Sequence, residues 1–265
     1  MPVFPSIVFG AAMGLSLGLT GGGGSILAVP LLVYGLGLDL RVAVTVSLAV
    51  VGLTALFGTI IQARSGQVMW RSGVVLGVGG ILVAPVGAYL GTIVADDIVL
   101  VLFAAVMVFV GVRMARGRAE ARDLPVGRFA CPVGPAGRPT PTLACFAKLA
   151  GAGAVVGLLS GFFGVGGGFL LVPALILVGS VRIEPALATS LVAIALISVS
   201  GFLSNVGAID EFPLLLAVLF GAGGAVGMVA GAVVKRRLSA VVLNRIFAAV
   251  AIAAGIYVVA QVVLG

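Results

Sequence analysis

The chain contains one glycine-rich segment twice. Gly18–Pro30 reads GLTGGGGSILAVP and Gly161–Pro173 reads GFFGVGGGFLLVP, so 7 of 13 positions are identical at a spacing of 143 residues. Glycine has no side chain and breaks regular helix, so each cluster frees backbone N–H groups from their usual partners. In a membrane such groups are tolerated only inside protein or beside a water-filled cavity. Two matching interruptions therefore predict a transporter whose binding site lies where they meet.

The composition assigns the chain to the membrane. It is 62% hydrophobic and 9% charged, whereas soluble domains carry about 25% charged residues. Apolar runs such as Val42–Ile61 and Pro213–Val234 reach the roughly 20 residues that a membrane-spanning helix needs. The net charge of +7 is expected to follow membrane sidedness and not nucleic-acid binding. The expected fold is an all-α polytopic membrane protein.

The similarity between the two halves extends beyond the glycines. Ala43–Val50 matches Ala186–Ala193 at the same spacing, and the GAYLG of Gly87–Gly91 matches the GMVAG of Gly227–Gly231. The latter glycines are expected to serve close helix packing. Each half thus comprises one glycine-broken segment and three transmembrane helices. The predicted domains are a first repeat in residues 1–115, an Arg/Pro/Gly-rich cytoplasmic linker in 116–145 and a second repeat in 146–265.

The broken segment has an awkward length. Pro5–Leu36 is 32 apolar residues, about 48 Å as a helix, whereas one straight span needs about 30 Å. Each side of the break looks too short to cross alone. The segment is therefore either a tilted, broken span or a re-entrant hairpin with the glycines at its tip.

Charge distribution favours the hairpin. If both broken segments cross, 9 of the 15 Lys and Arg residues lie inside and 6 outside; if both fold back, 14 lie inside and only Arg41 outside. Lys and Arg prefer the cytoplasmic side. Equivalent loops also carry opposite charge, since Arg64 and Arg71 correspond to Asp210 and Glu211. Two inverted repeats, each with a re-entrant hairpin and three true spans, account for both observations.

Little in the chain suggests catalysis. There is no His, no buried acid–base pair and no nucleophile beside a base, so we expect no enzyme activity, no cofactor and no metal. Cys131 and Cys145 are too few for a structural zinc site, and the cytoplasmic side does not favour a disulfide. The Arg-rich linker is expected to anchor charge, and a contact with anionic lipid or a regulatory partner stays open.

The chemistry that remains is backbone N–H, helix dipoles and hydroxyls. Half-helices that begin after each break, at Ser25 and at the equivalent Gly168, would present partial positive charge and free N–H groups, which bind anions. Glycine clusters can also serve packing alone, and a serine can bond its own helix. The candidate substrate-binding residues are Thr20, Gly21, Gly22, Gly23, Gly24, Ser25, Ser47, Gly164, Gly166, Gly167, Gly168, Thr189 and Ser190.

The doubled glycine-rich start followed by Pro, the eight apolar segments and the Thr-Ser-Leu within Ala186–Ala193 resemble the sulfite exporter TauE/SafE family of prokaryotic membrane permeases. The resemblance covers nearly the whole chain, and Gly21–Ser25 and Gly164–Gly168 match the family's repeated motif. It implies transport of sulfur-containing anions such as sulfite, sulfoacetate and other organosulfonates. The first half departs from the pattern with Val46 where the second has Thr189.

The sequence therefore predicts a multi-pass permease of the cytoplasmic (inner) membrane that moves a small sulfur-containing anion by alternating access. Its partners would be the anion and the lipid bilayer, with no nucleic acid. Two alternatives stay open: a channel or carrier for a cation or neutral solute, and a membrane anchor subunit for a soluble sulfur-metabolism enzyme. The identity of the anion, the coupling ion, the direction of transport and the formation of a homodimer are also open.

Overall fold

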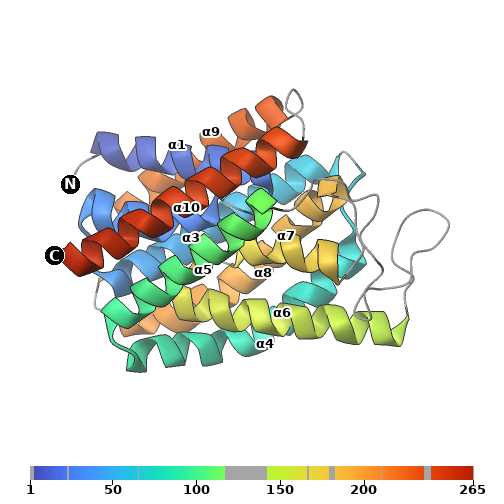
Figure 1. Cartoon of the computed structure of the whole chain (residues 1–265), viewed down its shortest axis with the longest axis horizontal. Coiled ribbons are helices and arrows are strands. Elements are labelled where there is room, and N and C mark those ends of the chain that lie inside the picture. The colour runs from blue at the N-terminus through green and yellow to red at the C-terminus, as the bar shows by residue number, and fades with distance from the viewer. Residues whose placement is uncertain are drawn as a thin grey trace.

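The computed structural model describes residues 3–264 except 23, 65, 117–141, 166, 179–182, 210 and 236–239. The described part of the chain is helical and contains no strand (Figure 1). The first half forms α1 (Val3–Thr20), α2 (Ser25–Pro30), the π-helical turn η1 (Leu31–Gly35), α3 (Leu40–Ala63), α4 (Trp70–Ile93) and α5 (Asp96–Arg116). The second half forms α6 (Leu143–Phe163), α7 (Gly168–Leu177), α8 (Ile183–Asn205), the 3-10 turn η2 (Val206–Ala208), α9 (Leu214–Lys235) and α10 (Ala240–Leu264).

Six of these helices are long and apolar enough to cross a membrane: α1, α3, α4, α6, α8 and α9. The prediction of an all-α polytopic membrane protein is confirmed. The expectation that neither arm of a broken segment can span alone is wrong, because α1 has 18 residues and α6 has 21, about 27 and 31 Å. Each break divides its segment unevenly. The arm before the break, α1 or α6, is long, and only the arm after the break, which contains α2 or α7, is short.

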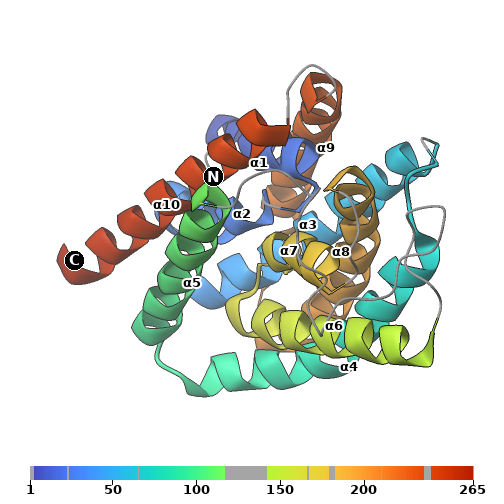
Figure 2. The same cartoon turned by 45° about the vertical axis from the view of Figure 1, so that its right-hand side comes forward.

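Glycine-lined seams join the two halves of the chain. Along the α1–α9 seam, Gly10 lies against Phe220 and Gly14 against Gly224, so these helices run parallel. An added Cβ at Gly10 or Gly14 would overlap the facing backbone. The α4–α6 seam has the same form, with Gly79 against Ala150 and Gly87 against Leu158. Figure 1 shows the two seams on opposite sides of the molecule, and Figure 2 shows α3, α7 and α8 between them.

The central helices α3 and α8 run antiparallel. Gly52 faces Ser198, whereas Leu48, earlier in α3, faces Gly201, later in α8. Helices α5 and α10 are also antiparallel, since Gly111 lies by Ala248 and Gly255 lies by Ala104. Taken with the seams, each long helix of the first half runs opposite to its counterpart in the second.

The first broken segment reverses direction at its glycines. Gly24 packs on Leu17 and Met13, and Gly35, at the end of η1, packs on Phe9, so α2 and η1 return beside α1. Gly37, with φ +68°, ends this return. The second segment reverses likewise. Helix α6 runs parallel to α4 and so begins at the same end of the bundle as α4, and α8 begins at that end too. The chain must therefore return to that end between α6 and α8.

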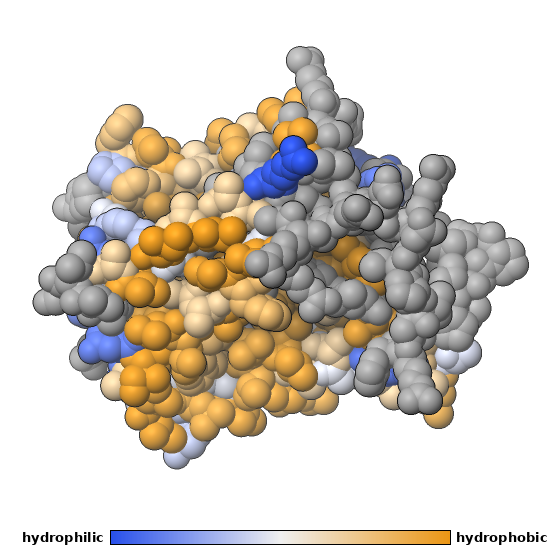
Figure 3. Space-filling model, viewed as in Figure 1, coloured by the Kyte–Doolittle hydropathy of each residue, from blue (hydrophilic) through white to orange (hydrophobic). Residues whose placement is uncertain are grey.

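The charges separate between the two ends of the bundle. The long helix faces between these ends are largely apolar (Figure 3). Both termini lie at the end that we call the acidic end (Figure 1). The acidic end carries Asp39, Arg41, Asp96, Asp97 and Glu211. The opposite, basic end carries Arg64, Arg71, Arg113, Arg116, Lys148, Glu184, Lys235 and Arg245.

Cys145, near the start of α6, is buried and disulfide-bonded. The expectation that a disulfide is disfavoured here is wrong for this structure. It rested on the compartment assigned to the linker, whereas bond formation also depends on how closely two sulfurs approach, which sequence spacing does not reveal. Cys131 lies outside the described residues.

Candidate functional site

The two glycine breaks touch each other through their backbones. A Cβ on Gly22 would overlap the carbonyl oxygen of Gly168, and a Cβ on Gly168 would lie 2.6 Å from the carbonyl oxygen of Gly22. Only glycine allows so close an approach. Gly22 precedes α2 and Gly168 begins α7, so the contact brings the starts of the two half-helices together.

The arms that lead into the breaks end in the same way. Gly21 and Gly164 each have φ +68°, the left-handed conformation that commonly ends helices. Gly21 N–H donates to the Leu17 carbonyl and Gly164 N–H to the Ser160 carbonyl, both at 2.8 Å. These two glycines are therefore helix caps as well as parts of the break.

The hydroxyls at the first break are already engaged. Ser25 Oγ donates to the Gly22 carbonyl at 2.8 Å. Ser190 Oγ donates to the carbonyls of Gly21, at 2.7 Å, and Leu187, at 3.0 Å. A serine hydroxyl has only one proton to donate, so neither Ser25 nor Ser190 has a second proton to offer a ligand. In this conformation Ser25 and Ser190 thus hold the break together and fix it to α8.

The two threonines among the predicted site residues also have structural partners. Thr20 Oγ1 donates to the Ser16 carbonyl at 2.7 Å, within α1. Thr189 Oγ1 accepts the Met69 N–H at 3.0 Å, at the residue before α4. Thr189 thereby links α8 to the start of α4 and does not face the first break as Ser190 does.

The second break differs from the first, because the hydroxyl beside it, Ser160, and the hydroxyl at the repeat position of Ser190, Ser47, have no partner among the described residues. Ser47 and Ser160 are 0% and 1% exposed, and neither Oγ has a hydrogen-bond partner in the described part of the chain. A Cβ placed on Gly167 would lie 3.1 Å from Ser160 Cβ and 3.4 Å from its Oγ. Gly167 is the N-cap of α7, with φ +64°. Ser160 therefore lies against the N-terminus of α7.

Ser160 is a residue that the sequence interpretation missed. The spacing of 143 residues pairs it with Leu17, so that a hydroxyl stands where the first repeat has an apolar side chain. The signal in the sequence is a polar residue in one repeat at a position where the other repeat has an apolar residue. Of the predicted glycines, Gly23 and Gly166 lie outside the described residues.

Backbone donors complete the region. The N–H groups of Gly22, Gly24 and Gly168 reach no acceptor among the described residues. Helix α7 has ten residues, enough for its dipole to place partial positive charge near Gly168. The buried polar side chains of the described residues are all Ser or Thr, and no acidic, His or Cys group there suits a metal. An anion would meet dipoles here and no buried cation.

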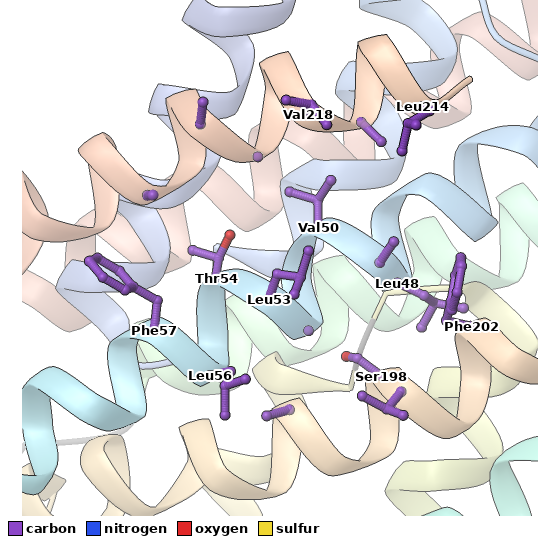
Figure 4. Close-up of a pocket in the computed structure, with 18 of the residues that line it drawn as sticks. Leu48, Val50, Leu53, Thr54, Leu56, Phe57, Ser198, Phe202, Leu214 and Val218 are labelled. Atoms are coloured by element: carbon purple, nitrogen blue, oxygen red, sulfur yellow. The ribbon is translucent and has the colours of Figure 1, made fainter. Parts of the chain in front are cut away.

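A separate apolar pocket of about 680 Å³ lies between α3, α8 and α9 (Figure 4). Its only hydroxyls belong to Thr54 and Ser198, and Ser198 Oγ has no partner in the described part of the chain. Leu53 and Val218, on its walls, are 68% and 57% exposed, so the pocket opens toward lipid. None of the predicted site residues lines it.

At the position equivalent to this pocket, α4 lies close against α8. Gly77 and Gly80 allow α4 to lie against Leu196 and Ile197 of α8. The repeat places Ala217 and Phe220 at the corresponding positions of α9. The residues of α9 are thus larger than the glycines of α4 at the equivalent positions, and the pocket lies on the α9 side.

Comparison with known proteins gives consistent matches. A family model described as Sulfite exporter TauE/SafE matches residues 6–258. A "Probable membrane transporter protein" of Xylella fastidiosa (strain Temecula1) is 36% identical over 253 residues, 94% of this chain and 92% of that protein. The "Probable membrane transporter protein YunE" of Bacillus subtilis (strain 168) is 31% identical over 210 residues, 75% of this chain and 76% of that protein. No solved structure matches significantly.

Proposed function

The chain belongs to the sulfite exporter TauE/SafE family of membrane transporters, and on that premise we propose that it moves a small sulfur-containing anion, such as sulfite or an organosulfonate, across the cytoplasmic membrane by alternating access. The observation that carries the proposal is the contact between Gly22 and Gly168, which joins the starts of two half-helices. The N–H groups of Gly22, Gly24 and Gly168 lie at that contact and reach no acceptor among the described residues.

A site built from helix starts favours negative charge. A helix start carries about half a positive charge and presents N–H groups, so it stabilises an anion and repels a cation. The described residues bury no Lys or Arg there. A fixed cation in a medium of low dielectric would hold an anion tightly, whereas dipoles allow it to be released. Release is necessary for transport.

Alternating access also needs two arrangements of similar energy, which inverted repeats provide. We propose that residues 1–115 and 146–265 are related by a two-fold axis in the membrane plane, with the contact of the breaks near the middle of the bilayer. The opposite directions of equivalent helices support this relation. Exchange of the two conformations would then expose the breaks to each side in turn.

Flux measurements in proteoliposomes test the function. We expect saturable movement of sulfite or a sulfonate by the purified chain alone, with thiosulfate and carboxylates as competitors and Na⁺ and K⁺ as cation controls. Anion flux without a partner protein would separate a permease from a membrane anchor subunit. Selective cation flux, or no flux of any tested anion, would contradict the proposal.

The charge separation predicts the orientation of the protein. In a variant without Cys131 and Cys145, an impermeant thiol reagent applied outside the cell is expected to label Asp97→Cys and to spare Arg64→Cys, because Lys and Arg prefer the cytoplasmic side. Labelling of position 64 alone would place the basic end outside.

A further inference from the structure

We propose that the transported anion is bound asymmetrically, at the second glycine break, with the hydroxyls of Ser160 and Ser47 as donors beside the N-terminus of α7. This inference rests on the proposed anion transport and goes beyond it, because a symmetric repeat would assign equal roles to both breaks. Under this proposal the first break forms a fixed wall of the site.

The hydroxyl protons of the two breaks differ in their availability to a ligand. At the first break, Ser25 and Ser190 donate to backbone carbonyls of the break itself. Ser160 at the second break and Ser47, at the repeat position of Ser190, are buried and donate to no partner within the described residues. A buried hydroxyl without a partner destabilises the fold. Ser160 beside the turn, and Ser47 at the position whose counterpart Ser190 reaches the first break, are therefore available as donors to a ligand.

The repeat itself shows that the difference is local. Ser47 is the counterpart of Ser190, and the contact of Gly164 with Val44 is the counterpart of that of Gly21 with Leu187. Ser190 donates to the Gly21 carbonyl, but Ser47 makes no matching bond to Gly164. The same position thus has an engaged proton in one half and an available one in the other.

The two half-helices also differ in the strength of their dipoles. Helix α7 continues for ten residues, whereas α2 has six before it passes into the π-helical turn η1. The longer, regular helix presents the better aligned peptide dipoles. Ser160 packs against its N-cap Gly167, and the N–H of Gly168 has no acceptor among the described residues. Hydroxyl, N–H and dipole therefore act at one place.

The site is closed in this structure. A Cβ on Gly164 would overlap Val44, and one on Gly167 would lie 2.8 Å from Val156. An anion can enter only if the second break separates from α3. The first break is tied to α8 by Ser190, so the second break is the more easily displaced of the two. Opening and binding would then involve the same hairpin.

Serine variants test the proposal, with Ser198→Ala as the matched control. Ser198 is 0% exposed and its Oγ is unpartnered like the other two, but it faces the apolar pocket. We expect Ser160→Ala and Ser47→Ala each to raise the KM for sulfite about tenfold, the effect of losing a hydrogen bond to a charged group. The maximal rate should change less than twofold, and Ser198→Ala should leave KM unchanged.

A second measurement separates binding from folding. Sulfite should raise the melting temperature of the purified wild type and of Ser198→Ala. The same rise in the melting temperature of Ser160→Ala should need a tenfold higher sulfite concentration. Should Ser160→Ala fold poorly, Ser160→Cys keeps the volume with a weaker donor and should also raise KM. Wild-type KM in the folded Ser160 and Ser47 variants, or an equal rise in Ser198→Ala, would overturn the asymmetric site. A wild type that neither binds nor moves sulfite or a sulfonate would instead overturn the proposed function and the site with it.

Discussion

Replacement of Gly22 by alanine is expected to abolish anion transport. The added methyl group would overlap the carbonyl oxygen of Gly168, and neither atom belongs to a side chain that can rotate away. The starts of the two half-helices must therefore move apart. Displacement of a preorganised site by about 1 Å typically costs a factor of about 100 in rate, and we expect the initial rate of flux in proteoliposomes to fall by about that factor.

The matched control is Gly151→Ala, in α6. No atom lies within 4 Å of a Cβ added at Gly151, so the same chemical change should leave the rate unaltered. Size-exclusion profiles of both variants in detergent would establish that each is folded. Normal transport by a folded Gly22→Ala protein would mean that the contact between the breaks is dispensable, and the site would have to lie elsewhere.

Gly14→Val is expected to destabilise the whole bundle. Gly14 lies on the α1–α9 seam, where an added Cβ would overlap the carbonyl oxygen of Gly224. Overpacking of this kind costs about 1–3 kcal/mol or more, because two backbones must separate along their length. At about 2–4 °C per kcal/mol, the melting temperature in detergent should fall by up to about 10 °C.

The size-matched control for the seam is Gly151→Val. It adds the same atoms in open space and should melt within about 1–2 °C of the wild type. The two valine variants differ only in whether a backbone faces the new side chain. Equal melting temperatures would show that α1 and α9 are not held together by close glycine contact.

Features that depend on local sequence were predictable. The apolar runs and the doubled glycine motif predicted an all-α membrane protein, which is confirmed. The prediction that Gly87 and Gly227 serve close packing is confirmed as well, since Gly87 lies against Leu158 and Gly227 against Ala11. Small residues spaced four apart mark a helix face directly, so no knowledge of the partner helix was needed.

Features that depend on the partner were not predictable. The repeat suggested equal roles for both breaks, yet a hydroxyl's role depends on which carbonyl it meets, and Ser190 and Ser47 differ in that respect. Ser160 was overlooked because the search compared identical positions and not the positions where the repeats diverge. The cross-pairing of α1 with α9 likewise follows from three-dimensional arrangement alone.

That cross-pairing constrains how the protein can be made. During synthesis, α1 with its glycine face is complete once Thr20 has been added. Its neighbour α9 is complete only when Lys235 has been added. At about 5–20 residues per second, a ribosome needs roughly 10–40 s to synthesise the intervening chain. Throughout that interval the first helix must wait in the bilayer or the insertion machinery with its packing face uncovered. Helix α4, by contrast, waits only until α6 emerges. Separate expression of the two halves would leave both seams without a partner until the fragments met.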